Sequence, residues 1–188
     1  MCIRDRTVIE IAEKAFEKKL KGLYIMGENP AMSDPNLNFT REALSRLDFM
    51  VVQDIFFTET AGFADIILPA SAFAEKDGTF TNTDRRVQLG RKAVDPPGEA
   101  KQDIWIIQEL AKRLGLDWQY TSVEDVFNEL RQTNETIGGI TWNMLNEKDS
   151  VTYPYTSNSK QSEPILFSES FPTRSGKATF VPAKFQKA

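Results

Sequence analysis

Polar side chains follow two apolar segments of this chain, in positions where they could hold a large polar ligand. Gln53 and Asp54 come directly after the apolar segment 49–52, and a second polar group, 75–78, comes soon after the apolar segment 64–70. In open α/β sheets, ligands bind just beyond the carboxyl ends of the strands. These side chains are therefore candidates for contacts with a large polar cofactor.

Each candidate also has a purely structural interpretation. The Asp54 carboxylate can accept hydrogen bonds from the N1–H and amino group of a guanine or from ribose hydroxyls, but it can also cap the following turn. Asn29 precedes Pro30, and this combination is common in turns that hold no ligand. Asp103 opens a predicted helix, where the helix dipole favours an acid. Residue type alone leaves both interpretations open.

The chain lacks the residues that most catalytic chemistry requires. It has no histidine, and its one cysteine is Cys2. A zinc site of Cys and His, an iron–sulfur cluster, a Cys–His pair and a Ser-His-Asp triad are therefore excluded within it. We expect no catalytic and no metal-ligating residue in this chain. It can form no internal disulfide, which is compatible with the cytoplasmic location that we expect.

Length and composition predict a globular protein with one main domain. A hydrophobic content of 40% and a charged content of 27% fit this class. The net charge of −4 argues against general nucleic-acid binding. No segment approaches the roughly 18–20 apolar residues of a membrane span. The first six residues, MCIRDR, suggest a foreign leader, although an ordinary chain terminus is the alternative.

Strand, helix and strand follow one another here at the spacing of a βαβ unit. We expect an α/β fold with a three-layer, mostly parallel, Rossmann-like sheet, followed by the incomplete start of a β-rich domain. The domains expected are the leader 1–6, an α/β domain 7–150, and a linker with the β-rich start 151–188. Helices are predicted at 7–21, from Asp34-Pro35 onward, at 103–114, from Ser122 to about 131 and at 141–146; strands are predicted at 23–26, 49–52, 64–68, 164–167 and 178–181, and segment 75–91 is predicted to be irregular.

Three long segments carry a family resemblance: Gly27–Asn36 (GENPAMSDPN), Val51–Gln88 and Pro96–Gly115. They resemble the molybdopterin oxidoreductases, and most closely the alpha subunit of NAD-dependent formate dehydrogenases. The resemblance runs from about Thr7 to the C-terminus. The family's metal-ligating Cys or selenocysteine, its neighbouring His and its N-terminal iron–sulfur cysteines have no counterpart here. The resemblance therefore implies an internal fragment of a longer subunit.

The resemblance assigns cofactor contacts to five residues. It implies that Asn29, Gln53, Asp54, Lys76 and Asp103 contact molybdopterin guanine dinucleotide, with Gln53, Asp54 and Asp103 at its guanosine part. The charge of Lys76 suits an anionic dinucleotide, although a solvated surface lysine is the structural alternative.

Three further charged residues receive other roles. Any role of Glu28 is expected towards ribose or base, because a carboxylate would be repelled by the pyrophosphate. Arg85 and Arg86 are expected in structural salt bridges rather than in ligand contacts.

By this resemblance, the parent enzyme would oxidise formate to carbon dioxide at a molybdenum or tungsten centre. Electrons would pass through iron–sulfur clusters, which this segment does not bind, towards NAD. The partners expected are the rest of the alpha subunit and the NAD/flavin-binding and iron–sulfur subunits. The alternatives are a nitrate reductase-like enzyme, a non-catalytic electron-transfer subunit with the same fold, and a generic nucleotide-binding module. The generic nucleotide-binding module has no support in the sequence, because the chain contains neither a G-x-G-x-x-G nor a P-loop sequence.

Overall fold

The computed structural model describes residues 6–159 and 161–184, so residues 1–5 of the predicted leader lie outside the described residues. The chain divides into two compact units. The first comprises the chain up to Glu75 together with Val94–Leu110. The second comprises Lys76–Ala93 together with the chain from Ala111 onward.

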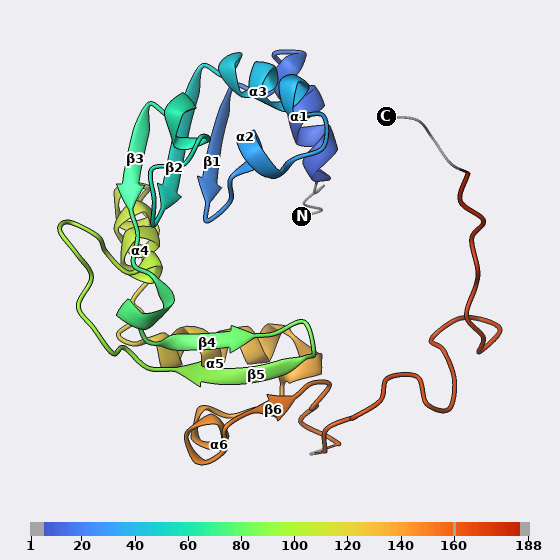
Figure 1. Ribbon diagram of the computed structural model, residues 1–188. Helices are drawn as coiled ribbons and strands as arrows, with labels where there is room; N and C mark the ends of the chain where they lie inside the picture. The colour runs from blue at the N-terminus through green and yellow to red at the C-terminus, as the bar shows by residue number, and fades with distance from the viewer. Residues whose placement is uncertain (1–5, 160, 185–188) are drawn as a thin grey trace. The chain divides into compact units, whose positions relative to one another are not determined.

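A parallel three-stranded sheet forms the centre of the first unit (Figure 1). Its strands, in the order β1-β2-β3, are β1 (Gly22–Met26), β2 (Phe49–Asp54) and β3 (Ile66–Pro69). In its register, Ile25 pairs with Val52, and Val52 pairs with Ile67. The predicted α/β class with a parallel sheet is thereby confirmed.

Three helices cover one face of this sheet: α1 (Val8–Phe16), α2 (Pro30–Ser33) and α3 (Leu37–Ser45). α1 begins at a capping box, in which the Thr7 hydroxyl accepts from the Glu10 N–H and the Glu10 carboxylate accepts from the Thr7 N–H. The core under the helices contains Leu44 of α3 with Met50 and Val52 of β2, all buried. Apolar burial on this face holds the helices to the strands.

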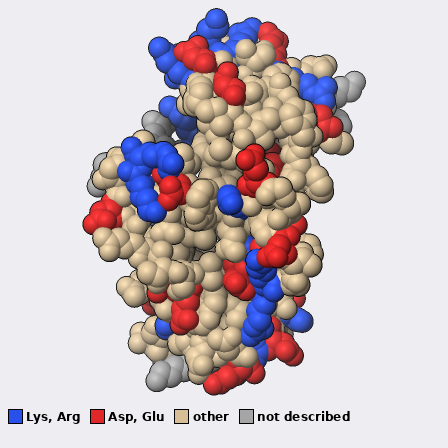
Figure 2. All heavy atoms as spheres, turned by 90° about the vertical axis from the view of Figure 1, so that its left-hand side faces the viewer, with Lys and Arg blue, Asp and Glu red and all other residues tan. Residues whose placement is uncertain are grey.

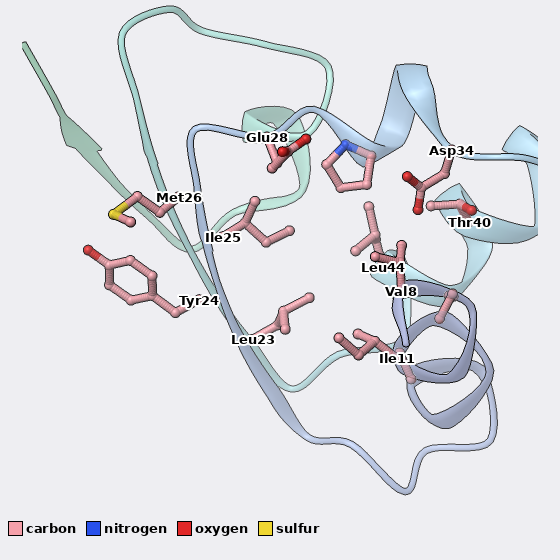
Figure 3. Close-up of a pocket in the computed structure, with 14 residues that line it drawn as sticks. Val8, Ile11, Leu23, Tyr24, Ile25, Met26, Glu28, Asp34, Thr40 and Leu44 are labelled. Carbon is pink, nitrogen blue, oxygen red and sulfur yellow. The ribbon is translucent and has the colours of Figure 1, made fainter. Parts of the chain in front are cut away.

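The opposite face of the sheet is less completely covered. Side chains alternate between the two faces of a strand, so Tyr24 and Met26 leave β1 on the side away from Leu23 and Ile25, as Figure 3 shows. Tyr24 is 39% exposed and Met26 is 49% exposed. Gln53, which pairs with Met26 in the register, lies on the same face. The side chain of Asp103, the first residue of α4 (Asp103–Arg113), reaches this face.

The second unit has an antiparallel sheet of β4 (Gly78–Thr81), β5 (Arg86–Gly90) and β6 (Val151–Thr152). Helices α5 (Val123–Thr133) and α6 (Trp142–Glu147) complete it. Its core consists of Val87, Phe127, Ile137, Ile140, Leu145 and Val151. The predicted capping box of Ser122 and Asp125 is present at the start of α5.

Three local structures differ from those predicted. The helix predicted from Asp34-Pro35 is present as α3, but it begins at Leu37, because Asn36 directly before it adopts a left-handed backbone conformation with φ 52°. The first helix stops at Phe16 rather than at residue 21, because Lys18 adopts a left-handed backbone conformation with φ 55°. Segment 75–91 is not irregular, because β4 and β5 pair as a hairpin within it.

The two strands predicted near the C-terminus are also absent. Residues 164–167 form bends and turns, and residues 178–181 have no regular structure. A strand requires a partner for its backbone groups, and no strand pairs with either segment within the described residues. The predicted domain boundary near residue 150 stays a prediction.

Basic and acidic side chains are interspersed on the face of the molecule drawn in Figure 2, which shows no broad basic area. Among residues 6–159 and 161–184, no helix has the length and apolar character needed to cross a bilayer.

Candidate functional site

The carboxyl ends of the three parallel strands form one edge of the first unit's sheet. The Gly27 N–H, directly after β1, donates to the Gln53 carbonyl at 2.9 Å, and the Ala70 N–H, directly after β3, donates to the Asp54 carbonyl at 3.0 Å. The segments that follow β1 and β3 therefore converge on the end of β2. This is where an open α/β sheet places its ligands.

Gln53 and Asp54 point in different directions, although the sequence analysis grouped them as a pair. Gln53 lies on the face away from the buried core residues Met50 and Val52, because side chains alternate along a strand. Gln53 is fully buried, at 0% exposure, whereas Asp54 is half-buried at the end of the strand. The two side chains therefore have different surroundings.

Both ends of the Gln53 side-chain amide are hydrogen-bonded within the protein. Its Oε1 accepts from the Tyr24 hydroxyl, and its Nε2 donates to Asp103 Oδ1 at 2.7 Å. A buried amide has to be paired in this way, since an unpaired one would lose its hydration without compensation. Partial burial raises the pKa of the Tyr24 hydroxyl, and the nearby Asp103 charge raises it further.

Asp103 begins α4 and is joined to Gln53 of the central strand, 50 positions earlier in the sequence. A carboxylate in the first helical turn is favoured by the helix dipole, as the structural interpretation holds. The bond to Gln53 adds a feature that this interpretation does not require, because it fixes the direction of one Asp103 oxygen. The structure thus brings two of the five predicted contact residues together.

Asp54 caps a turn with only one of its two oxygens. Its Oδ1 accepts from the Ile55 N–H at 2.6 Å and from the Phe56 N–H at 3.4 Å, and these residues form a bend rather than a helix. Its Oδ2 has no hydrogen-bond partner within the described part of the chain. The capping role is therefore real, and it leaves one oxygen available to a ligand.

The Asn29 side chain ties the turn after β1 to the loop after β2. Its Oδ1 accepts from the Thr60 hydroxyl at 2.7 Å and from the Thr60 N–H at 3.1 Å, and its Nδ2 donates to Glu59 Oε2 at 2.7 Å. The bond from Asn29 is the main cause of the lowered pKa of Glu59. Asn29 is the N-cap residue of α2, but its side chain makes no capping hydrogen bond to that helix. It therefore organises the edge on which the candidate site lies.

We predict that Asn29→Ala destabilises the chain by about 2 kcal/mol, because it leaves the buried Thr60 hydroxyl and its N–H without their acceptor. Urea denaturation followed by circular dichroism measures the change. Asn38→Ala is the control, since Asn38 is exposed on α3 and its side chain has no hydrogen-bond partner among the described residues. Equal stability of the two variants would contradict this role for Asn29.

The remaining basic candidates belong to the second unit. Lys76 lies there, half-buried, shortly before β4, and its predicted cofactor contact stays a prediction. Arg86 pairs with Asp84 at 3.0 Å, which confirms the structural salt bridge expected for it. The Arg85 guanidinium also has a structural role, but it donates to the carbonyls of Tyr153, Glu163 and Pro164 rather than to an acid.

Sequence reasoning missed three residues that organise the edge: Tyr24, Glu59 and Thr60. Tyr24 had a weak signal, because a tyrosine hydroxyl in an apolar strand usually finds a hydrogen-bond partner. Glu59 and Thr60 had none, since their partner Asn29 lies 30 and 31 positions away.

An apolar cavity of about 350 Å³ lies elsewhere in the first unit, between α1, β1 and α3 (Figure 3). Val8, Ile11, Leu23 and Leu44 contribute to its wall, and Glu28 lies at its margin. Asn29, Gln53, Asp54 and Asp103 are not among its lining residues. A polar dinucleotide requires hydrogen-bonding groups, so we place the candidate site at the strand edge instead.

The sequence profile of the molybdopterin oxidoreductases matches residues 2–113 of this chain. The chain belongs to the molybdopterin oxidoreductase family. Membership implies a molybdopterin cofactor that carries molybdenum or tungsten.

The chain is also similar in sequence to two curated relatives, and in fold to one solved structure. The chain is 49% identical over 172 residues to the "F420-dependent formate dehydrogenase subunit alpha" of Methanocaldococcus jannaschii, covering 90% of this chain and 25% of that protein. It is 42% identical over 176 residues to "Probable oxidoreductase YjgC" of Bacillus subtilis, covering 94% of this chain and 18% of that protein. Acetylene hydratase from Pelobacter acetylenicus shares the fold, with a TM-score of 0.62 and 24% identity over 76% of this chain and 20% of that one. The chain thus spans a quarter or less of the length of these proteins.

The strand edge fits the organic part of such a cofactor. Asp54 and Asp103 supply carboxylate acceptors there, and Ser71, just after β3, has a fully buried hydroxyl with no hydrogen-bond partner among the described residues. Buried polar groups normally have a partner, so this hydroxyl is consistent with a ligand-binding edge. Within residues 6–159 and 161–184, no group of three or more His, Cys, Asp or Glu side chains could hold a metal ion.

Proposed function

We propose that this chain is a segment of the alpha subunit of a molybdenum- or tungsten-dependent formate dehydrogenase. In this proposal it supplies one wall of the site for molybdopterin guanine dinucleotide. The observation that carries the proposal is the Asp103 carboxylate, held by Gln53 at 2.7 Å beside the carboxyl edge of the sheet. The name of the M. jannaschii relative supports formate as the substrate.

The residues of this chain would bind and orient the cofactor rather than react. Guanine presents an N1–H and an amino group as donors, and the Asp54 and Asp103 carboxylates are acceptors when ionised. Lys76 would place a positive charge near the pyrophosphate, and Asn29 would keep the edge in shape. The bound cofactor supplies the redox chemistry, in which formate loses two electrons and a proton to give carbon dioxide.

We further propose that the assembled enzyme is cytoplasmic and passes electrons through iron–sulfur clusters of other segments or subunits to NAD. NAD/flavin-binding and iron–sulfur subunits would be the partners. The M. jannaschii relative is named for F420, which makes F420 the competing acceptor.

A chimaeric subunit, in which this chain replaces the matching segment of the M. jannaschii subunit, tests the function. Formate-dependent reduction of a dye supports the proposal, and a cofactor-loaded chimaera without it contradicts the proposal. The rates of formate-dependent reduction of NAD and of F420 by the chimaera then show which of the two is the electron acceptor.

We predict that the 188-residue chain alone has no formate dehydrogenase activity. It contains no histidine, and its one cysteine precedes the sheet, so the metal-side groups of the family have no counterpart in it. The assay uses purified chain, added molybdopterin cofactor, formate and a dye acceptor, with the chimaeric subunit as the positive control. Metal-dependent turnover by the chain alone would contradict this prediction.

A further inference from the structure

Tyr24, Gln53 and Asp103 form a chain of hydrogen bonds that links two neighbouring strands to a helix N-terminus. The Tyr24 hydroxyl of β1 donates to Gln53 Oε1 of β2, and Gln53 Nε2 donates to Asp103 Oδ1 at the start of α4. Tyr24 and Gln53 lie on the same face of the sheet. All three residues belong to the first unit.

The direction of these bonds follows from the chemistry of the three groups. An ionised carboxylate only accepts hydrogen bonds, so Gln53 must present its NH₂ group to Asp103 and its carbonyl oxygen to Tyr24. The flipped amide would turn its oxygen towards the Asp103 carboxylate, and two acceptors repel each other. Tyr24 stays a donor at neutral pH, because burial and the Asp103 charge both raise the pKa of its hydroxyl.

Gln53 is poorly placed to contact a ligand itself. Its side chain is fully buried, and both ends of its amide already have protein partners. What it controls is the orientation of Asp103, since a carboxylate bonded through one oxygen cannot rotate freely. The Tyr24 hydroxyl in turn prevents the amide from flipping.

The geometry points to Tyr24 and Gln53 as positioning residues, which hold the Asp103 carboxylate in the orientation that accepts the N1–H and amino donors of a guanine. This inference rests on the proposed function, because it assumes that Asp103 faces the guanine. It assigns Tyr24 a role in the cofactor site, and it makes the role of Gln53 indirect. A base that lacks these two donors would form no such pair of hydrogen bonds with the oriented Asp103 carboxylate.

The test is a double-mutant cycle in the chimaeric subunit, with Tyr24→Phe, Asp103→Ala and the double variant. The retained cofactor is measured as guanine released by acid hydrolysis and as molybdenum or tungsten per chain, over time after gel filtration. Tyr24→Phe keeps the ring and removes one hydrogen bond, so it should speed cofactor loss roughly threefold to tenfold. Met26→Leu is the control, since Met26 lies on the same face as Tyr24 and pairs with Gln53 in the register, and its side chain has no hydrogen-bonding N–H or O–H group to lose.

The double variant separates positioning from general structural support. If Tyr24 acts through Asp103, Tyr24→Phe adds no further loss once Asp103 is alanine. Equal retention by Tyr24→Phe and the unsubstituted chimaera, or an additive loss in the double variant, overturns the inference. Full retention by Asp103→Ala would instead show that the proposed site itself is wrong.

Discussion

Replacing Asp103 by alanine is expected to speed loss of the guanine dinucleotide from the chimaeric subunit by at least a hundredfold. A carboxylate that accepts two donors of one guanine makes two charge-assisted hydrogen bonds, each worth about 1.5–3 kcal/mol. Their combined loss corresponds to on the order of a hundredfold or more in affinity. Metal and guanine per chain after gel filtration measure this effect directly.

The competing interpretation is that Asp103 only complements the dipole of α4. Glu124→Ala is the matched control, because Glu124 is an exposed first-turn acid of α5, which has 11 residues like α4. A dipole contribution is worth about 0.3–1 kcal/mol, so both variants would then lose a little stability and keep their cofactor. If the Asp103→Ala subunit kept its full cofactor content, the only role of Asp103 would be to complement the dipole of α4.

Asp54→Asn is expected to lower cofactor retention at least tenfold while leaving the melting temperature almost unchanged. Asparagine keeps an Oδ1 acceptor for the Ile55 N–H, so the turn after β2 retains its cap. It replaces Oδ2, which has no partner among the described residues, with an NH₂ group that faces the guanine donors. The expected decrease of at least tenfold corresponds to the loss of one charge-assisted hydrogen bond, which is worth about 1.5–3 kcal/mol.

Two further variants isolate the cause. Asp54→Ala removes the cap as well, and it should lose both cofactor and stability. Asp48→Asn changes an exposed acid at the opposite end of the same strand, where no cofactor contact is expected. An Asp54→Asn subunit that keeps its full metal and guanine content would show that Asp54 is a turn cap and nothing more.

Local patterns were enough to predict the central sheet and most of its helices. The apolar segments that became β1, β2 and β3 are short and bounded by polar or turn residues, and the Ser122–Asp125 capping box marked the start of α5 correctly. The helix predicted from Asp34-Pro35 forms, but α3 begins at Leu37, because Asn36 directly before it adopts a left-handed backbone conformation. The residue types in this turn do not show in advance which position takes that conformation.

The candidate site was predicted in its members but not in its connections. Tyr24 meets Gln53 across 29 positions, Gln53 meets Asp103 across 50, and Asn29 meets Thr60 across 31. These pairings depend on how the strands and α4 pack, and no local periodicity contains that information. The opposite orientation of Gln53 and Asp54, by contrast, follows from the two-residue period of a strand and was predictable.

In the proposed site, the strand edge at Asp54 and Asp103 receives the guanine of the cofactor. A crystal or cryo-electron microscopy structure of the cofactor-loaded chimaeric subunit measures this geometry. An oxygen of each carboxylate is expected to lie about 2.7–3.0 Å from a donor nitrogen of the guanine. A guanine bound elsewhere, with both carboxylates facing solvent, would contradict it.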